Sequence, residues 1–324
     1  MLLKLIAGTI AIFLPFPISG VTLQQPSCVS RTVPMNVVNA NGIQAGQPEG
    51  VDLEARVGSK RANIISVSKD SHPRRVVILL DASGSMSGET EAGGKWTLAL
   101  RVAGEFVSDA PESETVSLIV FAGEILNTVG FSEDRNAILN ELKKLAPGFK
   151  ALSKKANKDT ALWDAISAGA DMLGPSNSGD VIYAITDGGD NESKERAGLA
   201  ERKLIERQIR LFGFFFYDEA YQGSSYSNAG DVIRMVHATG GSSAVLWPSS
   251  RLLQTYDLTS DRLAKLDQSV QLQIAKIGKY YRVEIVPASN GNKSERLSLT
   301  FSHPNDPKWR DAQLSYPHRI PPCS

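Results

Sequence analysis

The sequence predicts an α/β fold: a mostly parallel, doubly wound sheet with helices on both faces, flanked by β-rich segments. The first observation is that short apolar runs alternate with amphipathic stretches between residues 74 and 250. Continuous apolar runs are typical of strands buried on both faces, and helices placed between such strands build parallel sheets. The second observation is that the flanking segments are instead rich in β-branched residues and turn formers, which favours strands there.

The spacing of apolar residues defines the elements of the α/β segment. Apolar runs predict strands at 75–81, 116–123, 180–189, 211–218 and 242–247. Apolar residues at helical spacing predict helices at 95–110, 135–146, 160–173, 193–210 and 229–241. Most strands are thus followed by a helix, which is the connection that a parallel sheet requires.

Composition and turn signals divide the chain into four parts. These are a leader at 1–20, a β-rich flank at 21–73, the α/β domain at 74–250 and a C-terminal part at 251–324. The C-terminal part is expected to hold a linking helix near 260–276, a β-hairpin over 278–301 and a proline-rich tail.

The N-terminus resembles a secretory signal. Lys4 precedes a short apolar stretch that ends in small residues near Gly20, so we expect cleavage and export, with a secreted, periplasmic or cell-surface product. A membrane anchor is the alternative, but the stretch is short for a bilayer and contains Pro15 and Pro17. No stable membrane insertion is expected after cleavage. Lys and Arg (35) balance Asp and Glu (35), which gives no overall attraction to nucleic acid, and none is expected as a partner.

The two cysteines lie near the ends of the chain. In an exported protein, Cys28 and Cys323 could form one disulfide that ties the ends together. The alternative is two unpaired thiols in the terminal segments.

Oxygen-bearing side chains follow the ends of two predicted strands. Asp81 ends the first strand and is followed by Ser83 and Ser85, Asp187 ends another strand, and Thr160 opens a helix. Because the carboxyl ends of parallel strands meet at one edge of a sheet, these side chains should converge there. Carboxylates and hydroxyls are hard donors, which suit Mg²⁺, Mn²⁺ or Ca²⁺ rather than zinc or copper.

Three motifs carry a family resemblance. "DASGSMSG" is similar to the D-x-S-x-S motif of von Willebrand factor type A domains, "DTALWDAI" resembles the region that supplies their threonine, and "ITDGGDN" resembles the region of their second aspartate. The flanks also resemble those of secreted bacterial proteins with this domain. The resemblance implies a Rossmann-like fold and a metal-ion-dependent adhesion site, with Mg²⁺ expected first. Its ligands would be Asp81, Ser83, Ser85, Thr160 and Asp187.

The expected function is therefore metal-dependent protein binding in adhesion or assembly. The resemblance implies a partner protein whose acidic side chain completes the coordination of the cation. One alternative is a structural scaffold whose metal site only stabilises the fold. Another is that Asp81 and the serines merely cap helices, since these residue types favour helix N-termini.

A metal-dependent hydrolase is a further alternative, but catalysis is not expected. Aspartyl-phosphate hydrolases carry a second Asp two residues after the first, where Ser83 stands here. A phosphate loop of the form G-x-x-x-x-G-K-[ST] and an H-E-x-x-H motif are both absent from the sequence. None of the four histidines follows a predicted strand end, as a serine hydrolase would require.

Overall fold

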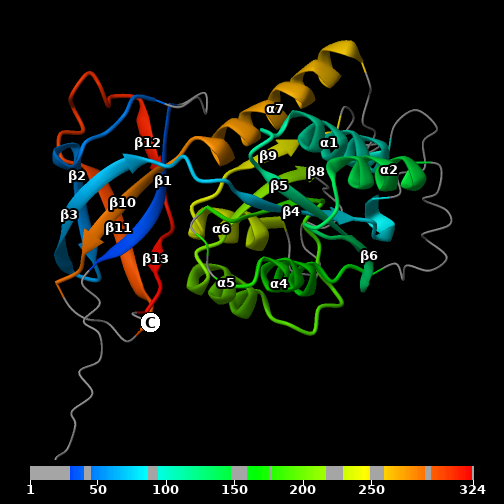
Figure 1. The fold of residues 1–324 in the computed structure, drawn as a ribbon, viewed down its shortest axis with the longest axis horizontal. Coiled ribbons are helices and arrows are strands. Elements are labelled where there is room, and N and C mark those ends of the chain that lie inside the picture. Colours follow the sequence, from blue (N-terminus) through cyan, green and yellow to red (C-terminus); the bar gives the residue numbers. More distant parts are fainter. Residues whose placement is uncertain are drawn as a thin grey trace, which may run out of the picture.

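The fold comprises two sheets that lie side by side in the computed structural model (Figure 1). The residues that it describes are 30–39, 45–86, 94–146, 159–175, 177, 179–216, 229–248, 259–288 and 293–322. The expected leader, Cys28 and Cys323 lie outside these residues. Within the described part, no helix is long and apolar enough to cross a membrane.

The first sheet has six strands in the order β6-β5-β4-β7-β8-β9. Their bounds are β4 Arg75–Asp81, β5 Thr115–Phe121, β6 Ile125–Val129, β7 Val181–Thr186, β8 Arg210–Phe216 and β9 Ser243–Leu246. All neighbouring strands pair in parallel except β5 and β6, which are antiparallel. The sequence prediction missed β6, because this short edge strand is mostly exposed and lacks a buried apolar run.

Helices cover both faces of this sheet, as the apolar strands predicted. One face packs against α1 (Lys95–Asp109), α2 (Arg135–Leu145) and α7 (Ser260–Gly278). The other packs against α4 (Leu162–Leu173), α5 (Ala197–Glu206) and α6 (Ala229–Ala238). Alternate residues of β4 enter the two cores: Ile78 and Leu80 one core, Val77 and Leu79 the other. The predicted α/β architecture is confirmed for this sheet.

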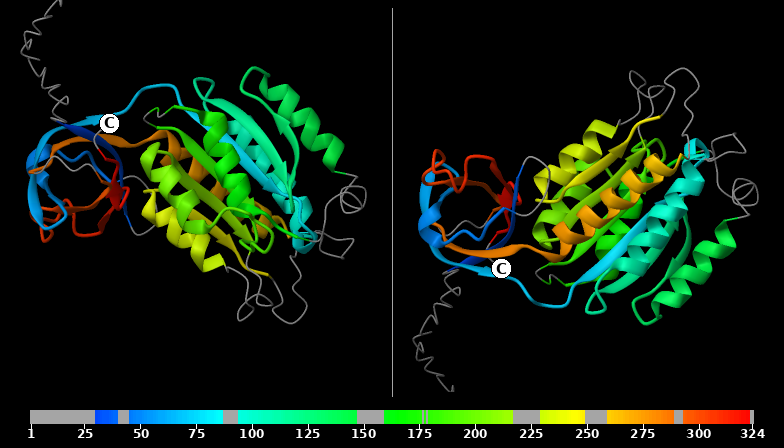
Figure 2. Two further views of the ribbon diagram at one scale, coloured as in Figure 1. Left: turned by 90° about the horizontal axis from the view of Figure 1, so that it is seen from below. Right: turned by 90° about the horizontal axis from the view of Figure 1, so that it is seen from above.

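The second sheet is antiparallel and curls on itself (Figure 2), so the doubly wound description applies to only part of the molecule. Its order is β12-β1-β10-β3-β2-β11-β13. The N-terminal strands are β1 Arg31–Asn39, β2 Leu53–Val57 and β3 Lys60–Lys69. The C-terminal strands are β10 Tyr281–Val286, β11 Glu295–Phe301, β12 Ala312–Ser315 and β13 Arg319–Ile320. The two ends of the sequence thus share one apolar core.

The predicted hairpin over 278–301 is wrong in its pairing. Both arms are strands, but β10 pairs with β1 and β3, whereas β11 pairs with β2 and β13. The β2–β3 hairpin, which turns at Gly58 with a φ of 61°, lies between them. Alternating apolar residues predict a strand, but they do not say which strand will lie beside it.

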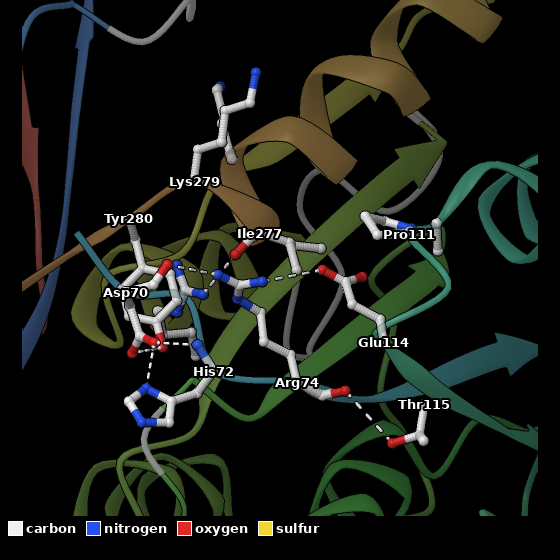
Figure 3. Close-up of polar contacts among 12 residues, drawn as sticks. Asp70, His72, Arg74, Pro111, Glu114, Thr115, Ile277, Lys279 and Tyr280 are labelled. Atoms are coloured by element: carbon white, nitrogen blue, oxygen red, sulfur yellow. Dashed lines mark hydrogen bonds and ion pairs between the residues drawn. The ribbon is translucent and has the colours of Figure 1, made fainter.

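A buried polar cluster joins the two sheets where the chain crosses between them (Figure 3). The Arg74 guanidinium lies 3.5 Å from Glu114 Oε1, and the Tyr280 hydroxyl donates to Asp70 Oδ2 at 2.5 Å. The backbone N–H of Asp70 also donates to the Tyr280 carbonyl, so the two crossing segments are hydrogen-bonded to each other. Arg210 is fully buried nearby, with its guanidinium 4.2 Å from the Tyr280 ring. These contacts hold the two sheets together near Arg75, where β4 begins. Asp81 lies at the other end of that strand.

Candidate metal centre

The candidate site lies at the carboxyl ends of β4 and β7, at the end of the first sheet that points away from the second (Figure 1). These strands are parallel neighbours, with Leu80 level with Ile185. Asp81 and Thr186, the next residue of each strand, therefore lie side by side. The pairing explains why residues more than one hundred positions apart in sequence meet here.

The Asp81 carboxylate is fully buried and held from both sides. The backbone N–H of Ser83 donates to Oδ1 at 2.8 Å, and the Thr186 hydroxyl donates to Oδ2 at 2.5 Å. Burial, and then the negative charge of Asp187, raise the pKa of Asp81 to about 7. The two carboxylates are therefore close enough to repel each other, and a cation between them would relieve that repulsion.

Ser83 and Ser85 place two hydroxyls directly after Asp81. Ser85 lies in a short 3₁₀ turn, Gly84–Met86, which brings its Oγ to 3.1 Å from Ser83 Oγ. Ser83 is fully buried, whereas Ser85 is partly exposed. The pair thus extends from the Asp81 carboxylate toward the surface.

Asp187 is buried, and its two oxygens have different environments. Oδ2 accepts from Lys95 Nζ at 2.9 Å. Oδ1 is buried without a hydrogen-bond partner among the described residues. Gly188 follows with a φ of 83°, a conformation that favours glycine, and its N–H donates to the Thr186 hydroxyl. The orphaned Oδ1 is the acceptor that a bound cation or water would satisfy.

Thr160 is tied to the loop that follows Asp187. Its backbone N–H donates to Asn191 Oδ1 at 2.7 Å, and its carbonyl accepts from the N–H groups of Asn191 and Glu192. The next residue, Ala161, donates to the carbonyl of Ala122 beyond the end of β5. The structure thus holds the Thr160 segment against both neighbouring loops.

Within the described part of the chain, none of the five predicted ligands is the N-cap of α1 or α4. The N-cap of α1 is Gly94, which has no side chain to cap the helix. At the start of α4, the N–H of Trp163 is accepted by Asp190 and Ser193 rather than by Thr160. The capping alternative therefore finds no support at the helices next to the site.

Two residues of this site, Lys95 and Thr186, were not predicted from the sequence. Thr186 stands directly before Asp187 at the end of a predicted strand, so its position was a usable signal. Lys95 begins α1, and no local pattern separates it from an ordinary solvated lysine. Only the fold brings its ammonium group to Asp187.

The oxygen donors fit a hard divalent cation, and the Lys95 ammonium is an unusual positive charge beside them. Carboxylate and hydroxyl oxygens are the ligands that such cations prefer, and Asp187 Oδ1 lacks any other partner in the described structure. No cluster of three or more His, Cys, Asp or Glu side chains suited to a metal occurs among the described residues. A cation at this site would therefore depend on the hydroxyls as well as on the two carboxylates.

Comparison with known families addresses the central part of the chain. Residues 76–189 match the family model for the von Willebrand factor type A domain. The matched part of the chain is therefore similar to a von Willebrand factor type A (vWA) domain. The matched segment begins in β4 and ends just after Asp187, so it spans the candidate site but not the second sheet.

Several proteins resemble the chain. The uncharacterized protein YwmC of Bacillus subtilis is 29% identical over 171 residues, which cover 47% of this chain and 70% of that protein. Among solved structures, BatB from Bacteroides thetaiotaomicron is 19% identical with a TM-score of 0.44, over 63% of this chain and 99% of that one. A von Willebrand factor type A protein from Catenulispora acidiphila is 13% identical with a TM-score of 0.43, over 91% and 75%.

Proposed function

We propose that the vWA domain of this protein captures an acidic side chain of a partner protein through a divalent cation. Mg²⁺ is expected first, and Mn²⁺ or Ca²⁺ are alternatives. The residues proposed to hold it are Asp81, Ser83, Ser85, Thr160 and Asp187. The observation that carries the proposal is the buried oxygen cluster at the strand ends, in which Asp187 Oδ1 has no partner within the described structure. Domains of this kind commonly serve as protein-interaction modules, which supports a binding function.

Some of these residues would supply negative charge to the cation, and others would orient the ligands. Asp81 and Asp187 supply negative charge, and the hydrogen bonds from Ser83 and Thr186 keep the Asp81 carboxylate in one orientation. The hydroxyls of Ser83 and Ser85 are neutral, so they would hold the cation without neutralising it further. A cation bound in this way would keep its electrophilic character and accept one more oxygen, from the partner's carboxylate.

We further propose that the protein acts outside the cytoplasm, in adhesion or assembly and without catalysis. The N-terminal sequence pattern supports export. The candidate site lies at the end of the first sheet away from the second (Figure 1). A partner could therefore approach the site without displacing the strands that close the antiparallel core.

Calorimetry with Mg²⁺ tests the site. Asp81→Ala should abolish Mg²⁺ binding while circular dichroism shows the fold intact. Asp171→Ala, which removes a carboxylate from the exposed side of α4, is the matched control and should bind Mg²⁺ like the wild type. Unchanged Mg²⁺ affinity in Asp81→Ala would refute the assignment.

A chelator separates the proposed function from the scaffold alternative. Partners would be recovered by pull-down from an exported or surface fraction, with Mg²⁺ or with EDTA. Metal-bridged capture predicts that EDTA abolishes recovery of the partner. A metal that only stabilises the fold predicts a lower melting temperature, with recovery preserved below that temperature.

A further inference from the structure

Lys95 places a permanent positive charge inside a site whose oxygens suit a cation. Its Nζ lies 2.9 Å from Asp187 Oδ2, and the exposed fractions of the two side chains are 5% and 1%. A buried ammonium and a buried carboxylate each carry a large desolvation cost, which is offset only when they pair closely. The lysine is therefore a buried part of the site and not a mobile side chain on the surface beside it.

The pairing uses only one of the two Asp187 oxygens. Oδ2 accepts from the lysine, whereas Oδ1 has no partner among the described residues. A divalent cation that reached Oδ1 would share the carboxylate with the ammonium, so two positive charges would lie on one acid. In a buried environment this repulsion is weakly screened by solvent and by salt.

We propose that Lys95 is a resident counter-ion of this site, one that competes with the divalent cation for Asp187 and lowers the metal affinity of the domain. This inference rests on the proposed function, since it concerns the same site. When Asp81 and Asp187 are ionised, these two acids and the lysine together carry a net charge of −1, whereas the two acids alone carry −2. The lysine weakens the attraction of the site for the cation, and it also neutralises Asp187 when no cation is bound.

Metal binding by lysine variants tests the proposal directly. Calorimetry at pH 8 would measure the Mg²⁺ and Mn²⁺ affinities of the wild type, Lys95→Met and Lys95→Arg. Methionine keeps much of the length of the side chain and removes its charge, so Lys95→Met should bind at least tenfold more tightly. Lys95→Arg keeps the charge and should stay within about threefold of the wild type.

A matched control separates this effect from a general loss of positive charge. Lys203 pairs with Asp171 between α5 and α4, with 3.1 Å between Nζ and Oδ2, and both side chains are partly exposed. Lys203→Met should leave the metal affinity unchanged. A comparable tightening in Lys203→Met would overturn the specific role of Lys95.

The outcomes distinguish this inference from the proposed function. If the wild type binds Mg²⁺, Asp81→Ala does not, and Lys95→Met binds no more tightly than the wild type, the counter-ion role is overturned and the metal site stands. If neither the wild type nor Lys95→Met binds Mg²⁺ or Mn²⁺, the metal site fails and the inference fails with it.

Thermal unfolding gives a second measurement that does not depend on one substitution. Without metal, Lys95→Met and Lys95→Gln should melt below the wild type, because Asp187 loses its counter-ion. Adding Mg²⁺ should then raise the melting temperature of Lys95→Met or Lys95→Gln, whichever folds, by more than it raises that of the wild type. An equal or smaller increase would overturn the proposal.

Discussion

Replacing Asp81 by asparagine should stabilise the metal-free protein at pH 8. Burial and the charge of Asp187 raise the pKa of the Asp81 carboxyl from its ordinary value of 3.8 to about 7. Because one pKa unit corresponds to about 1.4 kcal/mol, the ionised Asp81 costs the folded state up to about 4 kcal/mol. Asparagine carries no charge, and its oxygen can still accept from the N–H of Ser83.

The sign of the pH dependence follows from the direction of the pKa shift. Since the pKa is higher in the folded state than in the unfolded state, the folded protein holds this proton more tightly. The stability that the protonated Asp81 contributes to the fold is fully present below about pH 4. It is lost as the pH rises toward and through 7. The wild type and Asp81→Asn should therefore have similar stability near pH 4 and diverge by pH 8.

Urea unfolding followed by tryptophan fluorescence would measure the difference. In EDTA at pH 8, the free energy of unfolding of Asp81→Asn should exceed that of the wild type by up to about 4 kcal/mol. Asp171→Asn, at an exposed carboxylate, is the control and should change stability little.

Added Mg²⁺ should narrow or reverse the difference in the free energy of unfolding between Asp81→Asn and the wild type, because only the wild type is expected to bind Mg²⁺. At a concentration one hundred times the dissociation constant, binding adds about 2.7 kcal/mol to the wild type. Equal stability of the two proteins in EDTA at pH 8 would refute the reasoning, since it would mean that the buried charge of Asp81 has no cost.

Three further predictions concern the frame that supports the site. Arg210 donates to Asn36 Oδ1 and to a carbonyl of α7, so Arg210→Met should lower the free energy of urea unfolding by roughly 3 kcal/mol; a loss under 1 kcal/mol would contradict this. A Cβ on Gly241 would lie 1.7 Å from the Leu211 carbonyl oxygen, so Gly241→Ala should unfold at a much lower temperature in calorimetry; an unchanged melting temperature would show that the backbone adapts. Ser193 accepts from the first N–H groups of α4, so Ser193→Ala should cost about 1 kcal/mol in urea unfolding, whereas no change would argue that Asp190 suffices.

The α/β part of the fold could be predicted because its signals are local. Each interior strand of the first sheet is a continuous apolar run, and each of its helices shows an apolar stripe, so neither required knowledge of distant residues. The edge strand β6 was missed because its solvent-exposed residues carry no such signal. Asp81 and Asp187 could be found for the same reason, since Asp81 follows an apolar run directly and only Thr186 separates Asp187 from another.

The second sheet could not be predicted as one unit, because its pairing joins the two ends of the chain. Arg31 pairs with Ile285, and Leu53 pairs with Phe301. Alternation of apolar residues identifies strands in both flanks but carries no information about their neighbours. For that reason the sequence predicted a hairpin between β10 and β11, where the fold inserts β2 and β3.

The sequence by itself determined the interior strands and the helices of the α/β part, together with Asp81 and Asp187 at its strand ends. Those features depend on periodicity within short segments and on residue chemistry at the point where a strand stops. The tertiary structure alone decided that both flanks share one core and that Lys95 lies on Asp187, 92 residues away in sequence. Such contacts depend on which surfaces are buried against each other, and that information is distributed over the whole chain.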